Sequence, residues 1–399
     1  MDTHMSVVGL FAGIGGFELG FARAGFHTSL MCDVLPASRA VLQSHFPGVD
    51  YHDDVTTLRS LPRGTELLCA GFPCQDLSQA GRTEGLEGKR SGLIAEVFRL
   101  LRRQRVPTVV VENVPFMLQL NGGSAMRAII EEFESLGYRW AYRVVDSYGF
   151  GLPQRRERVF LVASRSLDPA SVLLTDDSPI ARPVSSLGQL AHGFYWTEGL
   201  GGLGWAVDAV PTLKNGSTIG IPSPPAILMP DGNLIKPGIR DVERMQGFAA
   251  DWTAPAEQVA RTAARWGLVG SAVSVPVAHW VGRRLKSPGV YDMDRDIEFS
   301  ATGRLARAAR FDGRRRTAVR IGTDPLGLRP PGLVEFLRDD PGQQLLSLKA
   351  TLGFLGRTRR AKLRFEPGFI EAVERHAVRM GGVAPPRAAR QQLDLLEAA

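Results

Sequence analysis

The chain has 399 residues and a mass of 43.4 kDa, which is long for one hydrophobic core and predicts two or three domains. Hydrophobic residues make up 44% and charged residues 22%, with a net charge of +7, so the chain is not of the disordered class and its basic balance is compatible with a nucleic-acid partner. The absence of a long apolar run and of signal-peptide features argues against a membrane protein and predicts a cytoplasmic one.

Residues 6–164 alternate short apolar runs with amphipathic stretches. The apolar runs predict strands at 6–11, 28–32, 66–72, 108–114, 142–147 and 158–164. Helical periodicity predicts helices at 17–26, 37–46, 91–104 and 125–137. This alternation predicts an α/β fold with a doubly wound, mostly parallel sheet, in which ligands bind at the carboxyl ends of the strands.

The pattern changes near residue 180. Residues 181–238 are rich in Gly, Pro and Ser and have little helical period, which predicts a small irregular domain of loops and short strands. Helical patterning returns in "GIRDVERMQGF" and "VPVAHWVGRRL". We therefore expect a large domain at 1–180, a small domain at 181–238, a return segment at 239–290 that completes the large domain, and a basic extension at 291–399.

A glycine-rich turn, "FAGIGGFELG", follows the first predicted strand. Its glycines, Gly13, Gly15 and Gly16, permit positive backbone angles and close approach of a ligand. Asp33 follows the second strand, where an acid can bind ribose hydroxyls, and Asp54 follows the third. Because no phosphate-binding lysine accompanies the turn, the pattern favours a nucleoside cofactor without a phosphate. A solvated carboxylate at a loop start is the alternative for both acids.

Cys74 differs in its surroundings from Cys32 and Cys69. In "LLCAGFPCQ", Cys69 lies inside the apolar run, whereas Cys74 follows Pro73, which stiffens the chain and cannot pair within a central strand. A thiol held in this way suggests a nucleophile, and an ordinary loop cysteine is the alternative. Three cysteines without nearby histidine ligands predict a reducing compartment, no disulfide framework and no zinc site.

Polar residues also end the later strands. Glu112 and Asn113 directly follow the apolar run "VVV", where burial would raise the pKa of the carboxyl and let it donate a proton; a loop-tying acid is the alternative. In "GLPQRRERVFLV", strand alternation sends Arg156 and Arg158 to one face. Together they would hold one anion, unless they form a solvated basic turn.

Taken in order, "FAGIGG", "GFPCQ", "ENV", "QRRER", "RDVERMQGF" and "GSAVSVPV" resemble the motifs of the C5-cytosine DNA methyltransferases over residues 6–286. The resemblance implies an S-adenosylmethionine methyltransferase fold, S-adenosyl-L-methionine as the cofactor and double-stranded DNA as the substrate. It implies Cys74 as the nucleophile and Glu112 as the acid at the cytosine ring, with Arg156 and Arg158 near the target base.

The resemblance also assigns binding residues. Those implied around the cofactor are Phe11, Gly13, Ile14, Gly15, Gly16, Asp33, Val34, Asp54, Val55, Ser271 and Val273. Those implied at the DNA are Pro73, Gln75, Ser78, Asn113, Gln154, Thr212 and Leu213, the last two in a Thr-Leu pair of a target recognition domain at 181–238. The chain departs from the family where Asp33 replaces the usual Glu and Ser271 the usual Asn.

Chemistry explains the residue types. Cytosine C5 is a poor nucleophile, so a thiolate must first add at C6, and protonation at N3 eases that addition. The cytosine must also be flipped out of the duplex, and the glycines and charges of residues 76–92 predict a lid that closes over DNA.

We therefore expect a monomeric, cytoplasmic and nucleoid-associated DNA cytosine-5 methyltransferase. We expect it to be sequence-specific and to act in a bacterial restriction-modification or phage-defence system, with a nuclease or defence proteins as candidate partners. RNA cytosine-5 methylation and an inactive DNA-binding scaffold are the alternatives.

The basic extension carries two open hypotheses. Residues 291–399 hold 20 Lys and Arg against 14 Asp and Glu, so six of the seven net charges lie there. The stretches "GRRRTAVRI" and "LGRTRRAKLRF" would contact DNA phosphates without selecting a sequence. Alternatively, "LLSLKATLGFLG" and "FIEAVERHAVRM" would dock a protein partner through apolar faces.

Overall fold

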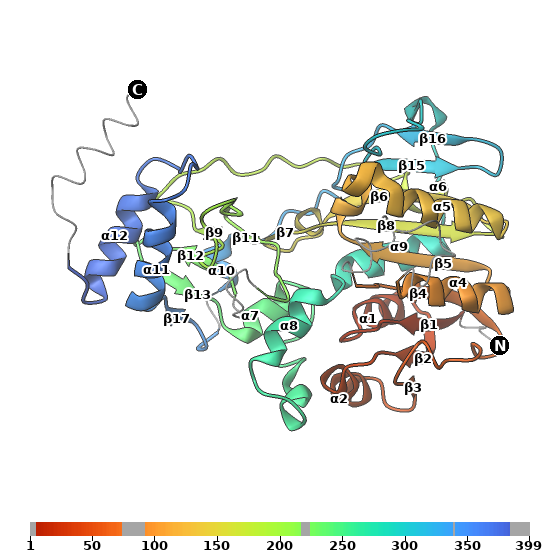
Figure 1. The fold of residues 1–399 in the computed structure, drawn as a ribbon, viewed down its shortest axis with the longest axis horizontal. Coiled ribbons are helices and arrows are strands. Elements are labelled where there is room, and N and C mark those ends of the chain that lie inside the picture. The colour runs from red at the N-terminus through yellow and green to blue at the C-terminus, as the bar shows by residue number, and fades with distance from the viewer. Residues whose placement is uncertain (1–4, 74–91, 217–223, 338–339, 384–399) are drawn as a thin grey trace. The chain divides into compact units, whose positions relative to one another are not determined.

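The computed structural model describes residues 5–73, 92–216, 224–337 and 340–383. The chain forms two compact units (Figure 1). Unit 1 comprises Met1–Leu152, Arg156–Ile180 and Glu243–Pro330, and unit 2 comprises Pro153–Arg155, Ala181–Val242 and Pro331–Ala399. Cys74, Gln75, Ser78 and all of the predicted lid except Gly92 lie outside the described residues.

Unit 1 is built on a sheet of ten described strands in the order β14-β16-β15-β6-β8-β5-β4-β1-β2-β3. Its parallel part consists of β1 (Ser6–Leu10), β2 (His27–Cys32), β3 (Asp50–His52), β4 (Thr65–Ala70) and β5 (Thr108–Asn113). Its antiparallel part consists of β8 (Glu157–Ser164), β6 (Arg139–Asp146), β15 (Ala308–Phe311), β16 (Arg316–Val319) and β14 (Asp296–Ile297). The six strands predicted from the sequence are confirmed.

Helices cover both faces of this sheet because the central strands are apolar on both sides. Val109 and Val111 of β5 join the core beneath α4 (Ile94–Arg103) and α5 (Ser124–Ser135), while Val110 joins the opposite core beneath α1 (Gly16–Arg23) and α9 (Val275–Lys286). Further helices of unit 1 are α2 (Pro36–His45), α6 (Ala170–Leu173) and α8 (Ala264–Ser271). Short 3-10 turns are η2 (Pro115–Leu118), η3 (Leu120–Gly123), η4 (Ser147–Gly149), η5 (Ala254–Gln258) and η6 (Met293–Arg295).

Unit 2 combines a small sheet with helices. Its described strands are β9 (His192–Phe194), β10 (Ala206–Val207), β12 (Ala226–Leu228), β13 (Leu234–Lys236) and β17 (Gln344–Leu345), while β11 (Val210–Pro211) pairs separately with β7 (Gln154–Arg155). Its helices are α10 (Leu333–Phe336), α11 (Leu348–Thr358) and α12 (Phe369–Arg379). Helix α7 (Ile239–Arg244) lies where the chain passes back into unit 1.

The residues expected to form one C-terminal extension are divided between the two units, which differs from the expected division of the chain. Strand β15 pairs antiparallel with β6, so residues up to 330 extend the sheet of unit 1 and cover the edge that β6 would otherwise expose. Strand β17 pairs with β13, and α11 and α12 supply much of the core of unit 2. No helix among the described residues is long and apolar enough to cross a membrane.

Candidate active site

The glycine turn and Asp33 meet at the carboxyl ends of β1 and β2. Gly13 has a φ of 58° and open space where a side chain would stand, and its N–H donates to Asp33 Oδ2 at 2.8 Å. The N–H of Leu35 donates to Asp33 Oδ1 at 3.0 Å, and burial raises the pKa of this carboxyl. Phe11 begins the turn with a φ of 55°. The structure therefore brings the turn and the acid together.

The return segment packs directly on this turn. A Cβ on Gly16 would lie 2.3 Å from the carbonyl oxygen of Val273, so only glycine permits the approach. Ile14 is buried, and its carbonyl accepts a hydrogen bond of 2.8 Å from the Trp252 indole. Ser271 is exposed at the end of α8. Residues far apart in the sequence are thus packed together around the glycine turn.

The second acid has a different environment. Asp54 follows β3 and accepts the Thr56 N–H at 2.9 Å, and this hydrogen bond lowers the pKa of its carboxyl. Val55 beside it is buried in the core, whereas Val34, next to Asp33, is 69% exposed. Asp54 therefore caps its own turn, the arrangement of a loop carboxylate.

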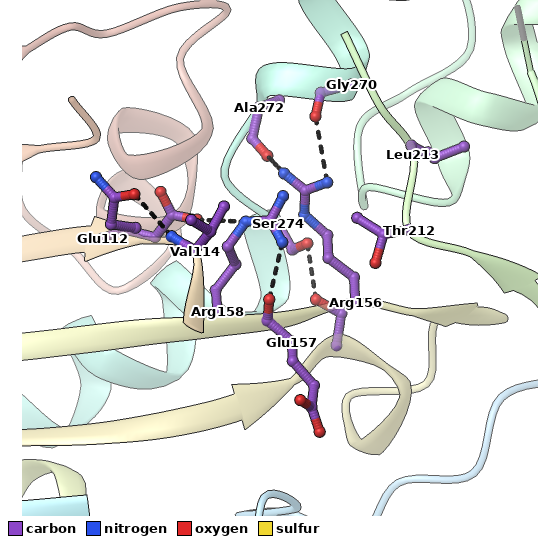
Figure 2. Close-up of polar contacts among 12 residues, drawn as sticks. Glu112, Val114, Arg156, Glu157, Arg158, Thr212, Leu213, Gly270, Ala272 and Ser274 are labelled. Atoms are coloured by element: carbon purple, nitrogen blue, oxygen red, sulfur yellow. Dashed lines mark hydrogen bonds and ion pairs between the residues drawn. The ribbon is translucent and has the colours of Figure 1, made fainter. Parts of the chain in front are cut away.

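Glu112 lies at the end of β5 and is paired with Arg158 of β8. The Glu112 Oε1 to Arg158 Nε distance is 3.0 Å, and the Glu112 side chain is 9% exposed (Figure 2). Burial raises the pKa of Glu112, while the charges of Arg158 and Arg156 oppose that rise. The result is a desolvated carboxyl that the Arg158 guanidinium orients.

Asn113 connects this strand end to the loop that leads to Cys74. Its side-chain amide donates to the Phe72 carbonyl at 2.9 Å, and its side-chain oxygen accepts the Val114 N–H at 2.8 Å. Asn113 is buried, whereas Pro73 is exposed. In the described residues Asn113 therefore acts on the backbone of two loops and fixes the chain two residues before Cys74.

Arg156 does not share an open anion site with Arg158. It is 1% exposed, and its guanidinium donates to the carbonyls of Gly270 at 3.2 Å and Ala272 at 2.8 Å (Figure 2). Strand alternation does not reveal that these carbonyls lie within reach of this side chain. Arg156 thus holds the turn between α8 and α9, which carries Val273.

The remaining predicted DNA residues form a small cluster inside unit 2. The Gln154 side-chain oxygen accepts the Leu213 N–H at 3.0 Å, and the Thr212 hydroxyl donates to the Arg155 carbonyl at 2.9 Å. Leu213 is buried. These contacts attach the Thr-Leu pair to β7, and the side chain of Leu213 serves packing.

Two side chains that hydrogen-bond within the site were not predicted from the sequence. The Gln246 side-chain oxygen accepts the Ser274 hydroxyl at 2.7 Å, and Ser274 lies 2.9 Å from the Ser147 hydroxyl. Trp252, besides its bond to Ile14, stacks on His45 with ring centroids 3.6 Å apart. The motif "RMQGF" contains Gln246 and could have indicated its role in the site. No feature of the sequence next to Trp252 indicates its contacts.

Comparison with solved structures identifies the class of fold. The Dnmt2 methyltransferase of S. pombe matches with a TM-score of 0.52 at 14% identity, and the methyltransferase EhMeth of Entamoeba histolytica with 0.53 at 13%. Each match covers 71% of this chain and 99% of the other chain. The predicted S-adenosylmethionine methyltransferase fold is therefore confirmed.

Sequence comparison identifies the family. The family description C-5 cytosine-specific DNA methylase matches residues 5–185. The Type II methyltransferase M2.BsuMI of Bacillus subtilis is 42% identical over 386 residues, covering 93% of this chain and 98% of that protein. The Type II methyltransferase M.MspI of Moraxella sp. is 34% identical over 41% of this chain and 39% of that protein. The chain belongs to the C-5 cytosine-specific DNA methylase family, which confirms the predicted resemblance and enzyme class.

Proposed function

We propose that the enzyme transfers a methyl group from S-adenosyl-L-methionine to C5 of a cytosine that is flipped out of a specific DNA sequence, through a covalent bond to Cys74. The observation that carries the proposal is Glu112, a buried carboxyl at a strand end, oriented by Arg158 and joined through Asn113 to the loop before Cys74. A carboxyl with a raised pKa at this position suits general acid catalysis.

The residues around the glycine turn fit the proposed cofactor. The Asp33 oxygens each accept one backbone N–H, which leaves lone pairs for ribose hydroxyls. Open space above Gly13 and the exposed apolar side chains of Val34 and Leu35 suit the rest of a nucleoside. Bound there, the cofactor would supply an electrophilic methyl group.

The chain's own residues carry the remaining chemistry. The Cys74 thiolate forms a bond to C6, and the electron pair that this addition displaces to N3 takes a proton from Glu112, which leaves C5 able to attack the methyl group. After C5 has gained its methyl group, a base removes the C5 proton, the C6–S bond breaks, the thiolate leaves and the Glu112 carboxylate takes back the N3 proton. Arg158 keeps the Glu112 carboxyl directed into this site.

The names of the relatives support a role in DNA modification. M2.BsuMI and M.MspI are both Type II methyltransferases. We therefore propose that this enzyme works at the bacterial nucleoid, as a monomer, within a restriction-modification or phage-defence system that includes a nuclease. Mapping of methylated cytosines in a host that expresses the chain would give one recurring site, whereas an unmethylated genome would contradict the proposal.

Substitution tests the two catalytic assignments. Cys74→Ser is expected to abolish methyl transfer and the covalent adduct with duplexes that contain 5-fluorocytosine at the mapped site, because fluorine at C5 blocks the final elimination. Glu112→Gln is expected to lose most methyl transfer while retaining cofactor affinity, because it removes only the proton donor. Glu157→Gln is the matched control, since this neighbouring carboxylate is partly exposed and pairs with Arg307.

The outcomes separate the alternatives. A stable adduct with unaltered protein and none with Cys74→Ser supports covalent catalysis. Full activity in Glu112→Gln would leave this residue a structural role only. Methylation of tRNA with none of DNA would replace the DNA substrate by RNA.

A further inference from the structure

The last part of unit 2 packs its apolar faces inward. Phe354 and Leu355 of α11 and Phe369 and Val373 of α12 are buried against Phe194 of β9 in one hydrophobic core. Aromatic contacts reinforce the packing, with the Phe194 and Phe369 rings 5.0 Å apart. A protein partner could reach these side chains only if the unit unfolded, so the amphipathic pattern of the two helices reflects their own core.

The basic side chains of the same segment point outward. Residues 341–365 contain six Lys and Arg and no Asp or Glu. Arg359, Arg360, Lys362 and Arg364 are exposed, at and just beyond the end of α11. We call these four residues the basic segment. In Figure 1 it belongs to the turn between α11 and α12.

Local pairing of the basic segment is weak. Arg359 lies 3.5 Å from Glu374, and Arg360 donates to the carbonyl of Gly356, which carries no charge. Within the described ranges, Lys362 and Arg364 make no ion pair. Arg360, Lys362 and Arg364 therefore remain in reach of solvent and form no ion pair with a carboxylate in the part of the chain that the structure describes.

The neighbouring Arg357 shows that this charge is felt locally. Its guanidinium is used inside the unit, donating to the carbonyls of Trp196 and Glu198. Burial and the positive charge of Arg360 lower the pKa of Arg357. An anion placed beside the segment would relieve this repulsion as well as pair with the exposed side chains.

We propose that the basic segment binds backbone phosphates of duplex DNA and strengthens binding to any sequence. The inference rests on the proposed function, since DNA is the polyanion that the enzyme must hold. Lysine and arginine donate to phosphate oxygens, and such contacts position a protein without reading bases. Sequence selection is then left to other residues of the enzyme.

The experiment uses charge substitution rather than deletion. Residues 296–319 complete the sheet of unit 1 and α11 and α12 complete the core of unit 2, so a truncated chain would lose folded structure as well as charge. The test variant is Arg360→Gln, Lys362→Gln and Arg364→Gln combined. The control variant, Arg304→Gln, Arg314→Gln and Arg320→Gln, removes three exposed arginines of unit 1.

Binding to a labelled random-sequence duplex and to one with the mapped site is measured by fluorescence anisotropy at several salt concentrations. Each lost phosphate contact lowers the slope of log affinity against log salt by about 0.9, so we expect the test variant to lose between about 1 and 3 slope units. Affinity should fall by the same factor for both duplexes. The control variant should keep the slope of the unaltered protein.

Three results would overturn the inference. An unchanged slope in the test variant, with thermal unfolding like that of the unaltered protein, would point to an acidic protein partner instead. An equal loss in both variants would make the effect one of net charge. A loss confined to the mapped site would make the segment a base reader. Methyl transfer by the unaltered enzyme in the same preparation reports separately on the proposed function.

Discussion

Two arginine-rich stretches of the C-terminal part, residues 304–320 in unit 1 and 357–364 in unit 2, are similar in sequence but differ in their surroundings. In the first, Arg310 pairs with Asp296 at 2.5 Å and Arg316 with Glu134 at 2.8 Å, and these carboxylates raise the pKa of both arginines. In the second, Arg359 pairs with Glu374 at the longer distance of 3.5 Å, and burial and the charge of Arg360 lower the pKa of Arg357.

The difference shows that arginine has two roles in this protein. In unit 1, Arg310 joins β15 to β14 and Arg316 joins β16 to α5 through ion pairs, so carboxylates of the fold neutralise these two charges. In unit 2 the exposed charges stabilise little and stay available for an external anion. The comparison predicts that charge removal at the paired Arg310 or Arg316 affects folding, whereas charge removal in the basic segment affects DNA binding.

The largest effect is expected at Arg310, which is 5% exposed and lies over the Tyr291 ring. Arg310→Gln should lower the free energy of unfolding by about 3 kcal/mol, because it leaves the Asp296 carboxylate, whose side chain is 11% exposed, without its close charged partner. Urea unfolding followed by circular dichroism measures this change. Arg314→Gln in the same hairpin is the control, since Arg314 is exposed and its replacement should cost less than about 0.5 kcal/mol. Equal effects of the two substitutions would show that the ion pair of Arg310 does not stabilise the fold.

A smaller effect is expected in acid. Although burial opposes it, hydrogen bonds and charge from Arg310 hold the pKa of Asp296 below its ordinary value. A lowered folded-state pKa gives stability that is present above the unfolded pKa of about 3.9 and is lost as the pH falls through the folded value. The unaltered protein should therefore lose stability faster than Asp296→Asn as the pH falls below about 5. Parallel losses, measured by thermal unfolding across this range, would show that the pair contributes nothing to acid sensitivity.

Much of the site could be predicted because its residues follow strands. Parallel strands present their carboxyl ends at one edge of the sheet, so we expected the glycine turn, Asp33 and Glu112 to lie near one another. In the described residues Asp33 accepts a hydrogen bond from Gly13, and Glu112 forms an ion pair with Arg158. Cys74 lies outside the described residues, so its placement stays a prediction.

The remainder depends on contacts that local sequence does not contain. Glu134, the partner of Arg316, lies 182 residues away in the chain, and Trp252 lies 238 residues from Ile14. Alternation along a strand likewise placed Arg156 and Arg158 on one face but could not assign carbonyls to one and a carboxylate to the other. The two arginine-rich stretches looked equivalent for the same reason.

The smallest effect on stability is expected in the basic segment itself. Arg360 is exposed, it donates to the backbone carbonyl of Gly356, and its charge lowers the pKa of Arg357. Arg360→Gln removes one surface hydrogen bond but also relieves that repulsion, so the free energy of unfolding should change by less than about 0.5 kcal/mol in either direction. Urea unfolding beside Arg310→Gln measures both variants under one condition. A loss of more than about 1 kcal/mol at Arg360 would mean that this side chain supports unit 2, and weaker DNA binding in variants of the segment would then have to be attributed to folding.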